Sequence, residues 1–315
     1  MLKKRLLSVL VLLVMPILLL SVSPSNTALP TATSELILPV EPSGTGVVRY
    51  QEFHSDVLER SYAYTIYLPD GYGLSGKIYP VVYLLHGSGG TEYDWLDNGR
   101  AKETADNLIG SGAIPPSIIV MPRSNSWWID GYNGKEKTAF FNDLIPHVDR
   151  MWRTIAAKDG RAVAGLSAGG YGAVNFILEH PELFAAGAAL SPAVYPLQPP
   201  DASSALRHPA FLAPTGEYDP QLWSESIYTR HLGKYREQEI KVPLYINSGA
   251  DDRFGIADHA LTLYRELRKV QPELVEFSLV EGDHEWAVWR KTLPEALTYM
   301  YRFVSPPRKA DGLLE

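Results

Sequence analysis

The pentapeptide Gly165-Leu166-Ser167-Ala168-Gly169 contains the serine that is best placed to act as a nucleophile. Apolar residues lead into it and a helical pattern follows at once, so the chain passes from a strand to a helix through a tight turn. Such a turn strains its central residue, and small flanking residues relieve the crowding. The turn exposes the Ser167 hydroxyl and leaves the backbone N–H of Ala168 without an intrahelical partner. The pattern predicts a nucleophile, although the same pentapeptide also occurs in turns whose serine does no chemistry.

A serine hydroxyl needs a base to attack an ester at neutral pH, and the base needs an orienting acid. His284 follows the apolar segment 274–280, which is a predicted strand. Asp251 and Asp252 follow the predicted strand 243–247. Nucleophile, acid and histidine therefore come in the order that α/β-hydrolases use. His284 is the predicted base, and the acid is Asp252 or Asp251, with Asp252 preferred.

One further acidic residue, Asp283, lies next to the predicted base. It is too near His284 in sequence to sit behind the imidazole ring. We expect Asp283 to be solvated or to cap the loop.

A glycine-rich loop supplies candidates for the second donor of an oxyanion hole, which needs two preorganised N–H groups. The apolar segment 79–85 ends in His86-Gly87-Ser88-Gly89-Gly90. Glycines let the backbone approach a ligand and direct its N–H groups. The predicted donors are Ala168 and Ser88, with Gly87 as the alternative to Ser88. We expect His86 to shape this loop by a hydrogen bond and not to act as the base.

Aromatic residues follow two of the predicted strands and could line an acyl pocket or stack on sugar rings. Trp127, Trp128 and Tyr132 lie in the loop after strand 117–121, and Trp286 follows the predicted base. The competing interpretation is that most of them pack in the core. No metal-ligand spacing is present, so we expect neither a metal nor a cofactor.

The elements that position these residues alternate between strands and helices. Predicted strands cover residues 46–54, 60–68, 79–85, 117–121, 184–190, 243–247 and 274–280, and predicted helices cover 101–109, 138–152, 168–179, 256–269 and about 286–303. The first two strands should pair in antiparallel fashion. The later alternation predicts an α/β fold with a mostly parallel sheet and helices on both faces. Pro146 should kink the helix 138–152.

The chain divides into a leader, a linker and one large domain. Lys3, Lys4 and Arg5 precede an apolar run over residues 6–20, which predicts a signal peptide at 1–28 and an extracytoplasmic or secreted protein. The alternative is an uncleaved N-terminal anchor, which would be the only contact with a membrane. We predict a linker at residues 29–45 and one large α/β domain at 46–304. Within the domain, residues from about 191 to 238 should form an insertion over the site, and after it residues 305–315 should form a loose tail.

The composition limits the classes of function. The 315 residues are 45% hydrophobic and 21% charged, which suits a globular domain with a sizeable core. The net charge of −7 argues against a nucleic-acid partner. The chain has no cysteine, which excludes disulfides, thiolate metal sites and a cysteine nucleophile.

The chain resembles the putative-esterase family of α/β-hydrolases over roughly residues 47–303. The family includes feruloyl and acetylxylan esterases, S-formylglutathione hydrolase and antigen-type mycolyltransferases. The residues that carry the resemblance are His86-Gly87-Ser88-Gly89-Gly90, Asp94-Trp95, Phe141 to Pro146, Gly165 to Gly172, Gly249 to Asp252, Gly282 to Trp286, and Trp289.

The resemblance implies an α/β-hydrolase fold with Ser167 as nucleophile, Asp252 as acid and His284 as base. The Gly-x-His-x-Trp-x-x-Trp ending and the leader are most similar to the feruloyl and carbohydrate-esterase branch. That similarity implies a small-molecule or carbohydrate ester as the substrate. Two alternatives stay open: an acyltransferase of the mycolyltransferase type, and a non-catalytic binding module on the same fold.

Overall fold

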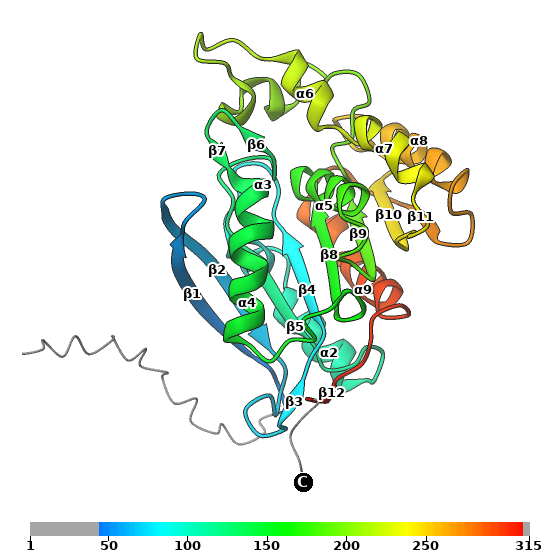
Figure 1. The fold of residues 1–315 in the computed structure, drawn as a ribbon. Coiled ribbons are helices and arrows are strands. Elements are labelled where there is room, and N and C mark those ends of the chain that lie inside the picture. The colour runs from blue at the N-terminus through cyan, green and yellow to red at the C-terminus, as the bar shows by residue number, and fades with distance from the viewer. Residues whose placement is uncertain (1–43, 311–315) are drawn as a thin grey trace, which may run out of the picture. The chain divides into compact units, whose positions relative to one another are not determined.

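A mostly parallel eight-stranded sheet forms the centre of the protein (Figure 1). The computed structural model describes residues 44–310, so the predicted signal peptide lies outside the described residues. The strand order is β1-β2-β5-β4-β8-β9-β10-β11. The strands are β1 (Val47–Ser55), β2 (Arg60–Leu68), β4 (Val81–Leu85), β5 (Ile118–Pro122), β8 (Arg161–Leu166), β9 (Ala186–Leu190), β10 (Leu244–Gly249) and β11 (Val275–Val280). In the order of the sheet, the six strands β5, β4, β8, β9, β10 and β11 run parallel, which confirms the predicted α/β class.

The two N-terminal strands form the predicted antiparallel hairpin at one edge of the sheet. Val47 pairs with Leu68 and Ser55 pairs with Arg60. Strand β2 continues the antiparallel pairing onto β5, which starts the parallel part. β2 is buried along almost its whole length, while β1 alternates between exposed and half-buried residues, as expected for an edge strand.

Helices cover both faces of the sheet (Figure 1). They are α1 (Asp94–Asp97), α2 (Ala101–Gly110), α3 (Glu136–Ala139), α4 (Ile145–Met151), α5 (Ala168–Glu179), α6 (Pro220–Ser226), α7 (Tyr228–Glu237), α8 (Ile256–Arg268) and α9 (Trp286–Met300). Helices α4, α5 and α8 pack on one face, and α2 and α9 on the other. The middle strands β4 and β8 are therefore buried from both sides.

The predicted helix 138–152 is interrupted rather than simply kinked. A π-helical turn over Phe140–Leu144 separates α3 from α4. Pro146 lies in the first turn of α4, directly after this π turn. The irregular stretch therefore lies just before the proline, and the helical backbone continues through it to Met151.

The insertion at 191–238 contains helices α6 and α7, which the sequence pattern did not predict. Two short 3₁₀ turns, Ser204–Arg207 and Pro209–Phe211, precede them. Tyr171 and Asn175 on α5 donate hydrogen bonds to the carbonyl oxygen of Ser226. The insertion is thus fastened to the helix that follows the predicted nucleophile.

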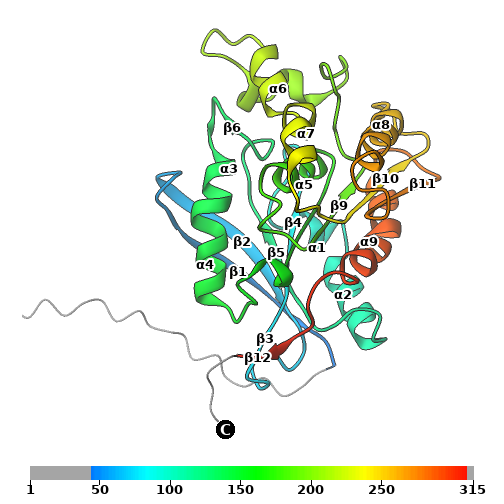
Figure 2. The same cartoon turned by 45° about the vertical axis from the view of Figure 1, so that its right-hand side comes forward.

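The expectation of a loose tail from Ser305 is wrong for residues 305–310. Strand β12 (Arg308–Lys309) pairs with β3 (Lys77–Ile78) in a two-stranded sheet. Ser305 and Arg308 both bind the carboxylate of Asp159. Because β3 directly precedes β4, this end of the chain lies at the amino ends of the parallel strands, close to the start of β1 (Figure 2). Residues 311–315 lie outside the described part.

Between residues 44 and 310, no helix combines the length and the apolar character that crossing a bilayer requires.

Candidate active site

Ser167 occupies the sharp turn between β8 and α5. Its φ of 54° and ψ of −116° are a strained conformation for a residue with a side chain. A Cβ atom on Gly165 would lie 2.4 Å from backbone atoms of Gly169, and one on Gly169 would lie 2.4 Å from the carbonyl oxygen of Leu85. Glycine is therefore required on both sides of the serine. The backbone N–H of Ser167 donates to the carbonyl oxygen of Leu190 and so fixes the turn to β9.

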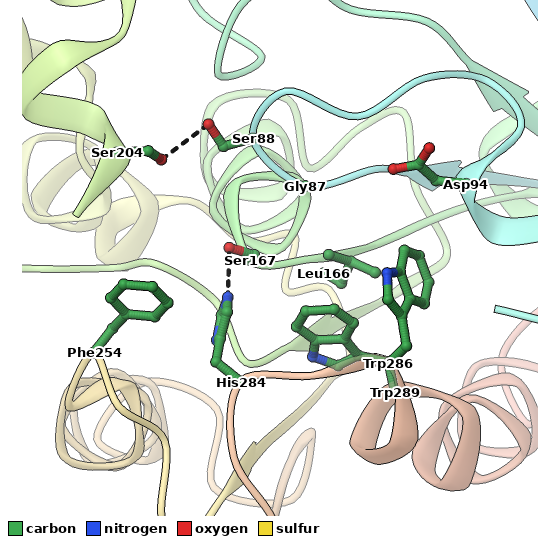
Figure 3. Close-up of a pocket in the computed structure, with 10 residues that line it drawn as sticks. All are labelled: Gly87, Ser88, Asp94, Leu166, Ser167, Ser204, Phe254, His284, Trp286 and Trp289. Atoms are coloured by element: carbon green, nitrogen blue, oxygen red, sulfur yellow. Dashed lines mark hydrogen bonds between the residues drawn. The ribbon is translucent and has the colours of Figure 1, made fainter. Parts of the chain in front are cut away.

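The structure brings Ser167, His284 and Asp252 together at the carboxyl ends of β8, β11 and β10. Ser167 Oγ lies 2.9 Å from His284 Nε2 (Figure 3), and His284 Nδ1 lies 2.7 Å from Asp252 Oδ2. The carboxyl group of Asp252 is fully buried, and its other oxygen accepts the N–H of Phe254 at 3.0 Å. Asp251, by contrast, is exposed. Of the two aspartates that the sequence left open, Asp252 is the one beside His284.

Aromatic rings hold the imidazole of His284 in place. Phe254 meets it edge to face at 4.9 Å between ring centroids, and Trp289 does so at 5.0 Å. The indole N–H of Trp289 donates to Ser191 Oγ, which fixes that ring in turn. The base is therefore restrained by packing as well as by its hydrogen bond to Asp252.

Asp283 caps the loop that carries the base. Its Oδ1 accepts the backbone N–H groups of His284 and Arg253 at 2.6 and 2.8 Å, and its Oδ2 pairs with the Arg253 guanidinium at 2.7 Å. The hydrogen bond from Arg253 is the main reason that the pKa of Asp283 is lowered to about 2. The geometry matches the loop-capping position expected from the sequence.

The buried side chain of His86 stabilises the glycine-rich loop by hydrogen bonds. It is buried, its Nδ1 donates to the carbonyl oxygen of Gly87 at 2.7 Å, and its Nε2 accepts the N–H of Ser124 at 2.9 Å. Burial lowers the pKa of His86 to about 4, so the ring is neutral near pH 7, as one donor and one acceptor require. Trp128 Nε1 donates to the carbonyl oxygen of His86 and fixes the loop from the other side.

Three backbone N–H groups near Ser167 are available to an incoming ligand. Those of Gly87, Ser88 and Ala168 have no hydrogen-bond acceptor among residues 44–310. Ala168 is the first residue of α5, where an N–H has no intrahelical partner. A Cβ atom on Gly87 would lie 3.6 Å from the Cβ of Ser167, so the glycine-rich loop runs directly beside the serine.

A cavity of about 240 Å³ opens over Ser167 and His284 (Figure 3). Its walls are formed by Gly87, Ser88, Asp94, Leu166, Ser167, Ser204, Phe254, His284, Trp286 and Trp289. The wall combines aromatic rings with a few polar groups, which is typical of a site for a small organic ligand. Ser204 is the contribution of the insertion.

Of the four aromatic residues predicted for the pocket, only Trp286 lines this cavity. Trp127 and Trp128 are 2% and 1% exposed, and their indole N–H groups donate to Ser88 Oγ and the His86 carbonyl. Tyr132 is exposed, and its hydroxyl donates to Asp219. Trp127 and Trp128 thus pack in the core, as the competing interpretation of these aromatic residues held.

Several residues of the cavity wall were not predicted to line it. Phe254 lies two residues after Asp252, and Trp289 lies one helical turn after Trp286, so both had a positional signal. Ser204 had none, because it comes from an irregular segment far away in sequence. In the part of the chain that the structure describes, no group of three or more histidine and acidic residues could hold a metal ion.

Comparison with known proteins connects this geometry to a family. Over 160 residues the chain is 36% identical to an endo-1,4-beta-xylanase/feruloyl esterase of Xylanibacter ruminicola, a match that covers 48% of this chain and only 22% of that protein. It is 25% identical over 227 residues to an acetyl esterase of Caldicellulosiruptor saccharolyticus, covering 70% of this chain and 82% of the relative.

A solved ferulic acid esterase superposes with a TM-score of 0.71 at 27% identity, over 82% of this chain and 99% of that one. Residues 55–300 match the Esterase family model, whose description reads "Putative esterase". This match spans more than half of the chain and includes the serine turn, the buried aspartate and the histidine loop. The chain therefore belongs to the Esterase family.

Proposed function

We propose that the protein is a serine carboxylic-ester hydrolase that works through an acyl-enzyme. The observation that carries the proposal is the continuous hydrogen-bond chain from Ser167 Oγ through His284 to the buried carboxylate of Asp252. Such a chain converts a weakly acidic hydroxyl into a nucleophile at neutral pH.

In the first half of the reaction, Ser167 Oγ attacks the ester carbonyl carbon while its proton passes to His284 Nε2. Asp252 holds Nδ1 protonated and stabilises the imidazolium that forms. His284 then gives the proton to the leaving alcohol, and the acyl group stays on the serine. In the second half, His284 activates a water molecule that hydrolyses this ester and restores the free serine.

The N–H groups of Ala168 and Ser88 are the proposed oxyanion donors, with Gly87 as the alternative to Ser88. The absence of protein acceptors for these groups in the described residues supports the assignment. A donor of this kind is typically worth about 3 kcal/mol of transition-state stabilisation, because it is already oriented before the charge develops.

For the substrate we propose an acyl ester of a carbohydrate, of feruloyl or acetyl type. The support comes from the names of the relatives, which include a feruloyl esterase and an acetyl esterase. The cavity wall is compatible with this class. Trp286 and Phe254 offer apolar surface, and Asp94 and Ser204 offer hydrogen-bond partners for the hydroxyl groups of a carbohydrate. No cofactor is needed for the proposed chemistry.

A panel of esters tests the proposal with purified protein. Methyl ferulate, acetylated xylan and p-nitrophenyl acetate are compared for wild type, Ser167→Ala and the control Ser224→Ala. Ser224 is an exposed serine on α6 whose hydroxyl donates to the carbonyl oxygen of Gln221, one turn earlier in the same helix. We expect hydrolysis by wild type and Ser224→Ala and none above background by Ser167→Ala. Equal rates for wild type and Ser167→Ala would refute the esterase proposal.

We also propose that the domain works outside the cytoplasm. The support is the leader pattern, in which Lys3, Lys4 and Arg5 precede the apolar run 6–20. N-terminal sequencing of the protein recovered from the culture medium or envelope tests this. A chain that stays in the cytoplasm with residues 1–28 intact would contradict it.

A further inference from the structure

The side chain of Ser88 joins three segments of the chain that are distant in sequence. Its Oγ accepts the indole N–H of Trp127 at 3.0 Å and the hydroxyl of Ser204 at 2.9 Å. Figure 3 shows the Ser88 and Ser204 side chains pointing toward one another across the top of the cavity. A serine oxygen accepts two hydrogen bonds, so these two donors use its full accepting capacity.

The first anchor, Trp127, is rigid because it is buried in an aromatic cluster. Its ring meets those of Tyr171, Phe211 and Trp223 edge to face, at centroid distances of 5.8, 5.8 and 5.9 Å. Tyr171 belongs to α5, while Phe211 and Trp223 belong to the insertion. The indole N–H that reaches Ser88 is therefore held by both parts of the protein.

The second anchor, Ser204, begins the 3₁₀ turn Ser204–Arg207 in the insertion. The preceding Ser203 caps this turn, since its hydroxyl accepts the N–H of Ala205. On the other side of the contact, Gly89 has a φ of +70°, and nothing lies within 4 Å of where its side chain would be. The loop is thus open directly after Ser88, and the Ser88 hydroxyl forms a hydrogen bond between the loop and the insertion.

We propose that Ser204 is a positioning residue for the ester hydrolysis. Through Ser88 Oγ it holds the backbone N–H groups of the glycine-rich loop where the oxyanion forms, and Trp127 is its partner in this task. The inference rests on the proposed function, because it presupposes an oxyanion next to Ser167. Oxyanion donors are effective because they need no reorganisation during the reaction, so a loosened donor lowers kcat. The insertion would then contribute to the chemical step as well as to the cavity wall.

Substitutions at the two anchors test the proposal with p-nitrophenyl acetate, whose small acyl group limits direct contact with the insertion. Ser204→Ala removes the hydroxyl donor, and Ser204→Thr keeps it. We expect about a fivefold fall in kcat for Ser204→Ala, the usual worth of one hydrogen bond, with KM nearly unchanged. Ser204→Thr should recover most of the loss. Trp127→Phe keeps the ring in the cluster but removes its N–H, and should cause a comparable fall in kcat.

A double-mutant cycle separates positioning from general destabilisation. Both anchors act through Ser88 Oγ, so Ser204→Ala should cause no further loss of kcat in a Ser88→Ala background. Ser224→Ala, elsewhere in the insertion, should leave kcat unchanged relative to the parent protein in both backgrounds, wild type and Ser88→Ala.

Inhibition by a boronic acid, which forms a tetrahedral adduct with the serine, supplies a second measurement. Its affinity should fall in parallel with kcat across the variants. Wild-type kcat in Ser204→Ala would overturn the proposal, and so would an equal loss in the Ser88→Ala background. An inactive Ser167→Ala together with a wild-type Ser204→Ala would refute this inference while leaving the esterase proposal intact.

Discussion

Replacing Asp252 by asparagine tests the roles within the proposed triad, because the structure fixes how the new amide must sit. In the wild type, Oδ1 of Asp252 accepts the backbone N–H of Phe254, while Oδ2 faces His284 Nδ1. The side-chain amide of asparagine can accept a hydrogen bond only through its oxygen, so the oxygen must face the N–H group that needs an acceptor. In Asp252→Asn the oxygen should therefore stay on Phe254, and the NH₂ group should face His284.

The consequence of this orientation is the wrong tautomer of His284. Nδ1 must then accept from the amide, so the ring proton moves to Nε2, which faces Ser167 Oγ. The imidazole can no longer take the serine proton. The equivalent change in a serine hydrolase lowers kcat by about four orders of magnitude, which corresponds to about 5 kcal/mol. The side chain is nearly isosteric and keeps the bond to Phe254, so we expect the fold to survive.

Steady-state hydrolysis of p-nitrophenyl acetate measures the effect, with Asp251→Asn as the matched control. Asp251 is the neighbouring, exposed aspartate, and its variant should keep activity within about twofold, as surface substitutions usually do. Far-UV and near-UV circular dichroism check that both variants are folded. If Asp252→Asn keeps more than a tenth of wild-type kcat, or if Asp251→Asn is the impaired variant, the reasoning is refuted.

Three further predictions concern the surroundings of the site. Gly169→Ala should abolish activity and lower the thermal midpoint, because its Cβ would lie 2.4 Å from the last carbonyl oxygen of β4, whereas Gly110→Ala, with open space around it, should do neither. Because burial lowers the pKa of His86 from 6.5 to about 4, the unfolded chain takes up this proton first as the pH falls. The contribution of His86 to the free energy of unfolding, about 3 kcal/mol, is present above pH 6.5 and lost by pH 4. Urea unfolding at pH 7 and at pH 4.5 should show this fall in the free energy of unfolding, and the fall should be smaller in His86→Asn. An equal fall in wild type and in His86→Asn would contradict the prediction. Asp283→Ala should lower kcat by no more than about tenfold, because it loosens the loop of His284 without removing a reacting group, and a loss as large as that of Asp252→Asn would contradict this.

Much of the fold was predictable because its signals are local. The strand Arg60–Leu68 and the helix Ala168–Glu179 match the prediction to the residue. Continuous apolar runs indicate strands buried on both faces, and β4 and β5 have this character. The relative order of serine, aspartate and histidine also predicted which three strand ends would meet.

The helices of the insertion were missed because packing, more than sequence period, maintains them. Trp223 on α6 is fully buried in the aromatic cluster. One local signal was present, since Asp219 precedes Pro220 and accepts the N–H groups of Gln221 and Leu222. An aspartate followed by proline is a recognisable start of a helix. This signal was hard to recognise because the insertion contains many other prolines.

The orientation of the loop tryptophans could not be predicted from their place after β5. A Cβ atom on Gly172 would lie 2.6 Å from the Cβ of Trp128, so this ring fits only because α5 carries a glycine at that point. Trp127 turns inward because residues of the insertion surround it. Both causes are tertiary contacts between distant segments, which periodicity does not reveal.

The pairing of β12 with β3 has a practical consequence for handling this protein. It places residue 310 at the amino ends of the parallel strands, near the start of β1, while the cavity opens at their carboxyl ends. A tether attached at either of these two positions would hold the domain by its base. On a bead, a cell surface or a fused carbohydrate-binding module, the cavity would then face outward toward a polymeric ester.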